Sequence, residues 1–150
     1  MTFTAHPAAM LPDCKEQLWV TWAAIWNGAY DLAPGIISPD FRIHVTLIDA
    51  DNSEIVGPAG LVAWIQQTTW AFADLTFTTT VGPIADEGHL VGQWRAHGTY
   101  QQGLPHIAVT AGTPVTFAGI DILRFDQGMA TEYWLTSDMT ALFHPAPAPK

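Results

Sequence analysis

Positive charge is scarce in this sequence of 150 residues, which has 5 Lys and Arg residues against 14 Asp and Glu. The formal net charge is -9 at pH 7. Nucleic acids are bound mainly by clustered Lys and Arg, which displace counterions from the phosphates. The composition therefore excludes nucleic acid as a main partner.

Cysteine and long apolar runs are also scarce. Cys14 is the single cysteine, so the chain cannot form an internal disulfide. Asp, Arg, Gln or Gly interrupts every apolar run before it reaches the ~20 residues that a membrane span needs. The first residues have neither the basic segment nor the continuous apolar segment of a signal peptide. We expect a soluble, cytoplasmic protein that has no membrane partner.

Several catalytic motifs are missing as well. The 6 histidines show no His-x-His or His-Glu-x-x-His spacing, and Cys14 has no second cysteine with which to bind a metal. The sequence has no Gly-x-Ser-x-Gly, no phosphate-binding loop and no Gly-x-Gly-x-x-Gly. We therefore expect no metal and no cofactor, and neither acyl transfer on serine nor nucleotide binding.

Apolar residues are abundant, at 49% of the sequence. A chain of this length and composition folds as a single domain, residues 1–150, with a sizeable core. We expect the folded part to cover about residues 13–143. Residues 1–12 form a leader and residues 144–150 a Pro/Ala tail, both flexible.

Two helices are predicted in the first half of the chain. Asp13 and Glu16 have the spacing of a capping box, which predicts a helix from about Cys14 to Tyr30 with a wide aromatic surface. Residues 31–39 predict a short turn or one-turn helix, followed by a strand over residues 41–47. After a polar loop at residues 49–57, Pro58 suits the first turn of a second helix that ends near residues 70–74.

Four strands are predicted in the second half, at residues 75–81, 90–100, 114–125 and 129–136. The turn at residues 126–128 joins the last two as a hairpin. Helices followed by a strand meander predict an α+β fold, in which the helices pack on one face of a curved antiparallel sheet.

Asp121 is the most informative residue, because neither face of its strand is typical of a solvent-exposed surface. Phe117, Gly119, Leu123 and Phe125 share its face, and the opposite face is apolar too. A buried carboxylate has a raised pKa, which suits a general acid or base. The alternative is a structural carboxylate that is hydrogen-bonded to a Thr, Trp or Arg side chain.

His44 and His97 lie within predicted strands, so each belongs to a defined face of the sheet. Gln93 and Arg95 share the face of His97, while Trp94 lies on the other. These polar residues either form the solvated side of the sheet or line a pocket that the helices cover incompletely.

The 7 tryptophans divide into two sets in this interpretation. Trp19, Trp26 and Trp94 are assigned to the core. Trp22, Trp64 and Trp134 are candidates for the wall of a pocket that binds a flat ligand.

Together, five segments resemble the SnoaL-like polyketide cyclases of the nuclear transport factor 2-like superfamily. The first are Trp26-Asn27 at the end of the first helix, Pro39-Asp40-Phe41 followed by His44, and Gly98-Thr99-Tyr100. The others are Gly119-x-Asp121-x-x-Arg124-Phe125 and Gly128-x-x-x-Glu132-Tyr133-Trp134. The resemblance covers about residues 16–138. It implies a cone of curved antiparallel sheet wrapped on helices, and a homodimer.

The resemblance also implies an activity, a cofactor-free intramolecular aldol ring closure of a hydrophobic, polyketide-like carbonyl substrate. Asp121 matches the proposed general acid/base of these cyclases. His44 matches a histidine that faces the cavity, and His97 is a second candidate donor to the enolate. Side chains expected to bind the substrate are Trp22, Trp64, Arg95, Tyr100, Phe117, Leu123 and Trp134.

Other activities of the superfamily stay open. Limonene epoxide hydrolases use an Arg-x-Asp pair on the middle strand, where this chain has Arg95-Ala96-His97. Ketosteroid isomerases carry a base near the end of the first long strand, where this chain has Val45. Epoxide opening, isomerisation and noncatalytic binding of a small molecule are therefore the alternatives to cyclisation.

Overall fold

The computed structural model describes residues 7–44, 55–104, 107–139 and 142. The order of the elements is α1 (Pro7–Trp26), η1 (Tyr30–Leu32), α2 (Ala33–Ile36), β1 (Ile37–His44), α3 (Gly57–Thr69), β2 (Phe72–Ala85), β3 (His89–Tyr100), β4 (Pro114–Asp126) and β5 (Met129–Asp138). The mixed α+β fold that the sequence predicts is confirmed. No helix among these residues is both long and apolar enough to cross a membrane.

Helix α1 begins and ends earlier than predicted. It begins at Pro7, so the capping box at Asp13 and Glu16 does not open it, and residues 7–12 are helical rather than a leader. Residues 8–11 are Ala-Ala-Met-Leu, which favour a helix. Its end at Trp26 is set by Gly28, whose φ of 112° breaks the helical path. The one-turn helices η1 and α2 follow, as predicted.

Five strands form one open sheet in the order β1-β5-β4-β3-β2. Strands β2 to β5 form the predicted antiparallel meander, and residues 126–128 make the predicted hairpin turn. The prediction of an entirely antiparallel sheet is wrong at one edge, because β1 pairs with β5 in parallel. Residues 45–47 of the predicted first strand, most of the loop at 49–57 and the tail at 144–150 lie outside the described residues.

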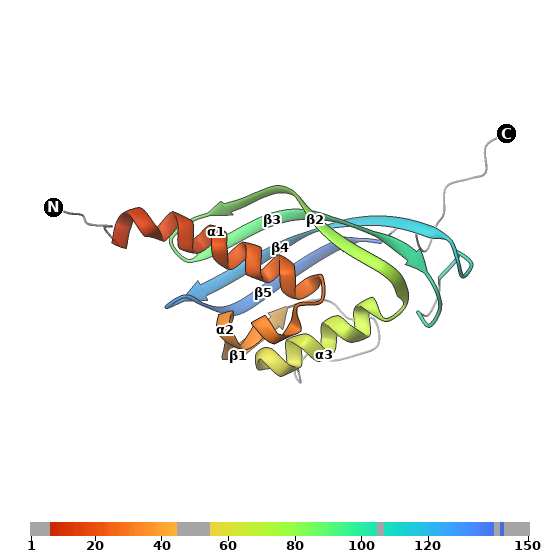
Figure 1. Ribbon diagram of the computed structural model, residues 1–150, viewed down its shortest axis with the longest axis horizontal. Coiled ribbons are helices and arrows are strands. Elements are labelled where there is room, and N and C mark those ends of the chain that lie inside the picture. Colours follow the sequence, from red (N-terminus) through yellow and green to blue (C-terminus); the bar gives the residue numbers. More distant parts are fainter. Residues whose placement is uncertain (1–6, 45–54, 105–106, 140–141, 143–150) are drawn as a thin grey trace.

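The helices lie on one side of the curved sheet, with α1 crossing it and α3 beside α1 (Figure 1). The side chains between them form two apolar clusters. The first cluster joins α1 and α3 to β1, β5 and the adjacent parts of β3 and β4, and includes Trp22, Phe41, Leu61 and Tyr133. The second lies toward the Tyr100 end of β3 and includes Phe72, Trp94 and Phe117. We call the sheet face that carries these side chains the inner face.

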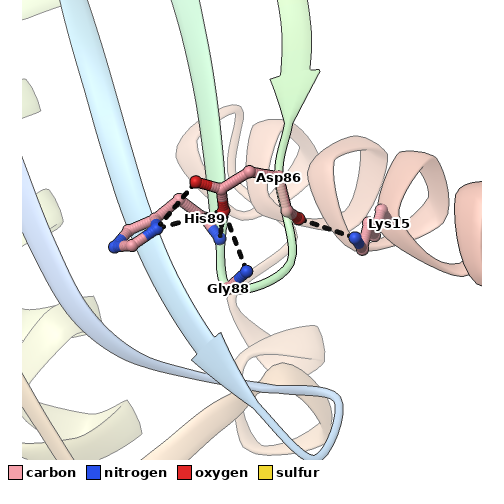
Figure 2. Close-up of polar contacts among 4 residues, drawn as sticks. All are labelled: Lys15, Asp86, Gly88 and His89. Carbon is pink, nitrogen blue, oxygen red and sulfur yellow. Dashed lines mark hydrogen bonds and ion pairs between the residues drawn. The ribbon is translucent and has the colours of Figure 1, made fainter.

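Polar contacts with the main chain of the sheet also hold α1 in place. Near the middle of α1, Lys15 Nζ donates a hydrogen bond of 2.6 Å to the main-chain oxygen of Asp86 in the β2–β3 turn (Figure 2). Asp86 Oδ1 in turn accepts hydrogen bonds from the main-chain N–H groups of Gly88 and His89. Just after the C-terminal end of α1, the Asn27 amide both donates to and accepts from the main chain of Phe77. These contacts hold α1 in one position across the inner face.

Candidate active site

Asp121 lies at the middle of β4 on the inner face, where its cross-strand partners are Gly92 on β3 and Leu135 on β5. Its side chain is only 4% exposed, and it is the one buried charged residue among those described. Alternation along the strand predicted that Asp121 shares a face with Gly119 and Leu123, and Leu123 is fully buried in the first cluster. Burial of a lone carboxyl group demands polar partners, since it loses its water.

Three neutral donors supply those partners. Asp121 Oδ1 accepts hydrogen bonds from Trp94 Nε1 and from the Tyr133 hydroxyl, both at 2.9 Å. Asp121 Oδ2 accepts one from Trp22 Nε1 at 3.0 Å. The donors come from β3, β5 and α1, so the carboxyl group joins the sheet to the helix above it. No cation among the described residues bonds to it.

The same arrangement sets the protonation of the site. Burial raises the pKa of Asp121 from 3.8 to about 6, while the hydrogen bonds from Trp22, Trp94 and Tyr133 oppose the increase because they stabilise the ionised form. The pKa of Tyr133 is raised well above its usual range by burial and by the negative charge of Asp121. Tyr133 therefore stays a neutral donor, and Asp121 can take up or release a proton near neutral pH.

Two glycines make room for the indole rings beside the carboxyl group. Gly119 is the cross-strand partner of Trp94, and a Cβ atom at Gly119 would overlap the Trp94 ring. Gly92 is the cross-strand partner of Asp121, and a Cβ atom there would overlap the ring of Trp19. Close packing of indole rings on a flat strand surface therefore requires glycine at these two positions.

Asp121 lies where the two apolar clusters meet. Its donors Trp22 and Tyr133 belong to the first cluster, and Trp94 belongs to the second. Phe77 and Leu135, both partly buried, pack against both clusters. The surroundings of the carboxyl group are thus aromatic and uncharged, which suits a flat apolar ligand better than a charged one.

The structure does not bring His44 to Asp121. His44 pairs in register with Trp134 on the face opposite the helices, and its ring stacks on Trp134 with centroids 5.1 Å apart. His44 Nε2 lies 2.9 Å from Glu132 Oε2, and Arg124 Nη1 donates to Glu132 Oε1 at 3.1 Å. The expectation that His44 faces the interior is therefore corrected, because the register of β1 on β5 turns it outward.

His97 and Arg95 also lie away from Asp121. Both are exposed and alternate with the buried residues Trp94 and Ala96 on β3. Trp94 shares the face of Asp121, so His97 and Arg95 point to the opposite side of the sheet. Of the two interpretations that the sequence allowed, the structure supports the solvated face.

The remaining expected ligand-binding residues are on the inner face, except for Trp134. Trp64 on α3 is half-buried and its ring contacts those of Trp26 and Tyr133. Leu123 is fully buried in the first cluster. Tyr100 and Phe117 are buried in the second cluster, both against Phe72.

Regular pairing would place Trp134 on the inner face and Tyr133 on the outer face, but the structure has them the other way round. Counting back from the hairpin turn, Asp126 pairs with Met129 and Phe125 with Ala130, but Arg124 then pairs with Glu132. This β-bulge shifts the register by one residue and turns every later β5 side chain to the other face. Tyr133 therefore reaches Asp121, and Trp134 lies on the outer face. Sequence reasoning missed Tyr133 as a donor because it has no signal for the bulge.

A hollow separate from Asp121 lies between α1 and the β2–β3 hairpin. It has a volume of about 230 Å³ and is lined by Lys15, Glu16, Pro83, Ala85 and Leu90. The described residues contain no group of three or more His, Cys, Asp or Glu side chains placed to hold a metal ion. Among these residues, Asp121 and its donors are the arrangement with the clearest capacity for chemistry.

The family follows from comparison with known sequences. The model of the SnoaL-like domain matches residues 19–133, which include Asp121 and its three donors, so the protein belongs to the SnoaL-like domain family. A search of curated proteins gave no significant match.

Solved structures show the same fold at low sequence identity. TsrD from Streptomyces laurentii superposes with a TM-score of 0.71 at 16% identity, covering 89% of this chain and 97% of that one. A SnoaL-like polyketide cyclase from Agrobacterium tumefaciens gives 0.70 at 15% identity, covering 85% and 93%. A protein from Catenulispora acidiphila with a ketosteroid isomerase-like fold, solved in complex with trimethylamine, gives 0.64 at 16% identity, covering 84% and 88%. At such identities the likeness defines the fold alone.

Proposed function

We propose that this protein binds a flat, hydrophobic carbonyl compound and catalyses acid/base chemistry at the carbon next to the carbonyl, with Asp121 as the base. One observation carries the proposal, namely a single buried carboxyl group that neutral donors hold on the inner face. Its pKa of about 6 leaves it ionised at pH 7 and still basic enough to take a proton. Membership of the SnoaL-like family supports the same class of reaction.

The hydrogen bonds indicate which oxygen would act. A carboxylate has about four lone-pair positions, two on each oxygen. Trp94 and Tyr133 use both positions of Oδ1, whereas Trp22 uses one position of Oδ2. The second position of Oδ2 is therefore the one we assign to the transferred proton.

The reaction needs no cofactor in this scheme. Oδ2 takes a proton from the carbon next to the carbonyl, and the electron pair of that C–H bond becomes an enolate. In ring closure, the enolate carbon attacks a second carbonyl carbon of the same molecule, and the new alkoxide takes the proton back from Asp121. Apolar walls that hold the substrate folded accelerate this step by proximity. The proposed product is a cyclic aldol.

The proposal can be tested by deuterium exchange into 2-tetralone, a flat bicyclic ketone with acidic C–H groups next to its carbonyl. We expect the protein in D₂O at pD 7 to accelerate loss of these proton signals in the NMR spectrum. Asp121→Asn removes the base, so its exchange rate should fall by at least 100-fold, the lower range for a positioned base. Circular dichroism and thermal unfolding check that the variant is folded.

A second variant keeps the proposal testable if Asp121→Asn does not fold. The NH₂ group that this substitution introduces could face the indole N–H of Trp22, and two donors cannot bond to each other. Trp22→Phe keeps the carboxyl group but removes one donor, so the pKa of Asp121 rises and the midpoint of the exchange-rate profile moves to higher pH. A rate that is unchanged in Asp121→Asn, or absent in the wild type, would contradict the proposed chemistry.

The second candidate function is a noncatalytic domain that binds a small molecule. The same three hydrogen bonds favour it, because they also suit a carboxyl group that only joins α1 to the sheet. This candidate predicts that 2-tetralone binds without exchange and that Asp121→Asn changes stability more than affinity.

A further inference from the structure

Trp26 carries a buried indole N–H that the structure leaves without an acceptor. Four tryptophans are buried among the described residues, and Trp26 is 8% exposed. Trp19 Nε1 donates to Thr79 Oγ1 at 3.0 Å, and Trp22 and Trp94 donate to Asp121. Trp26 Nε1 is the one buried side-chain N or O atom of the described chain that has no hydrogen-bond partner.

The ring of Trp26 is surrounded by four other aromatic side chains, which we call the aromatic cage. Its centroid lies 5.2 Å from Phe77, 5.6 Å from Trp64, 6.2 Å from Trp22 and 6.4 Å from Tyr133. All four contacts are edge to face. Trp64 on α3 and Phe77 on β2 are only partly buried, so these two members of the cage each expose part of their surface.

An unpaired N–H in this place has a physical cost. A buried donor that loses water without gaining an acceptor destabilises the folded state, whereas Phe would give an aromatic core contact at no such cost. A ring face is a weak acceptor and compensates only in part. An oxygen atom of a bound molecule is the acceptor that would satisfy Trp26.

The cage also limits the charge of that molecule. Its four members are uncharged aromatic rings, and two of them, Trp22 and Tyr133, bond directly to the carboxyl group of Asp121. An anionic oxygen would meet the negative charge of Asp121, which no cation among the described residues offsets. A neutral carbonyl oxygen on a flat apolar molecule fits both the donor and the rings.

We propose that Trp26 Nε1 donates a hydrogen bond to the carbonyl oxygen of a neutral, flat ligand that binds beside the Trp26 ring, against the partly buried members of the aromatic cage. The inference rests on the ligand binding of the proposed function and supplies the carbonyl donor that His44 and His97 cannot provide from the outer face. Trp22 and Trp26 are one helical turn apart on α1. One indole thus orients the base, and the next one along the helix binds the carbonyl oxygen.

The experiment uses the full chain labelled with ¹⁵N at its tryptophan indoles, titrated with 2-tetralone and with tetralin, the hydrocarbon that lacks the oxygen. The Trp26 resonance is identified as the one that is missing from the spectrum of the Trp26→Phe variant. We expect 2-tetralone to move this N–H proton downfield, whereas tetralin does not. Trp26→Phe should raise the Kd of 2-tetralone about three- to tenfold, the effect expected for loss of one hydrogen bond. It should leave the Kd of tetralin unchanged.

Trp19→Phe is the matched control, because it removes a paired indole N–H from the same helix outside the cage. Trp19→Phe should lower the melting temperature and leave 2-tetralone affinity unchanged. Trp26→Phe should lower the melting temperature less, because removal of an unpaired donor offsets part of the lost packing. The proposal would be overturned if neither compound moved the Trp26 resonance, or if both moved it alike. It would also be overturned if the Trp26 N–H proton stayed upfield in the presence of the ketone, because that position would assign the N–H to a ring face.

The test separates this inference from the proposed chemistry. A ketone-specific shift of Trp26 without deuterium exchange supports the binding role and contradicts catalysis by Asp121. Deuterium exchange without a shift of Trp26 contradicts the binding role alone.

Discussion

Asp121 is subject to two opposing effects at the scale of a single residue. Burial favours the neutral acid, whereas the hydrogen bonds from Trp22, Trp94 and Tyr133 favour the carboxylate. Burial prevails, and the pKa rises to about 6. A cation in the same place would reverse this balance and leave the carboxylate too weak a base at neutral pH.

The raised pKa predicts how stability depends on pH. Between pH 4 and pH 6 the folded chain holds a proton on Asp121 that the unfolded chain has released, so folding is favoured at the acid end of this range. This contribution is complete below about pH 3.8 and is lost as pH rises through about 6. The shift from 3.8 to about 6 corresponds to about 3 kcal/mol.

Urea unfolding at several pH values checks this prediction, with Asp121→Asn as the reference that cannot titrate. We expect the free energy of unfolding of the wild type to fall relative to that of the variant as pH rises from 4 to 7. Asp86, whose pKa is lowered chiefly by the Gly88 N–H, acts in the opposite direction, but it is present in both proteins and cancels. A constant difference between the two proteins would contradict the raised pKa.

The sequence predicted that Asp121 is a buried carboxyl group, but not which residues donate hydrogen bonds to it, and the reason is physical. Alternation along β4 places Asp121 among Phe117, Gly119 and Leu123 without any knowledge of tertiary structure. Trp22 and Trp94 lie far from it in the sequence, and their contact depends on how α1 crosses the sheet and how β3 pairs. Alternation alone could indicate that Asp121 needed donors, but not which residues supply them.

Local signals predicted some secondary-structure elements correctly, although the capping box at Asp13 and Glu16 gave the wrong start for α1. Helix α3 and the β4–β5 hairpin follow from Pro58 and from the turn at residues 126–128, and both are confirmed. The parallel pairing of β1 with β5 and the bulge after Arg124 depend on tertiary packing instead. That bulge decided the placement of Tyr133 and Trp134, because a shift of one residue turns a strand over.

The packing of β4 against β3 gives a prediction at the scale of the element. Gly119→Ala would push the Trp94 ring away from its place and weaken its hydrogen bond to Asp121. We expect a loss of about 1–3 kcal/mol, as for other overpacked cores, together with a further rise in the pKa of Asp121. Urea unfolding measures the stability change.

Gly35→Ala is the control for that substitution. Gly35 lies in α2, and a Cβ atom there would have no neighbour within 4 Å. We expect this variant to be unchanged or stabilised by up to about 1 kcal/mol. Equal stability of the Gly119 and Gly35 variants would show that the Trp94 ring is not held against Gly119.

At the scale of the whole molecule, the two faces of the sheet carry different kinds of side chain. The inner face holds the apolar clusters and Asp121, while the outer face carries His97, Arg95 and the contacts of Glu132 with His44 and Arg124. Of the polar strand residues that were candidates for the site, Asp121 lies on the inner face, whereas His44, Arg95 and His97 lie on the outer face. The homodimer and the cytoplasmic location that we expected remain predictions.

The central claim is that one buried carboxyl group titrates near neutral pH inside an aromatic interior. Its most direct test is a ¹³C NMR titration of aspartate-labelled protein, with the Asp121 side-chain carboxyl signal assigned by its loss in Asp121→Asn. The account predicts a midpoint at about pH 6, rising further in Trp22→Phe. A midpoint at or below pH 4 in the wild type would contradict it.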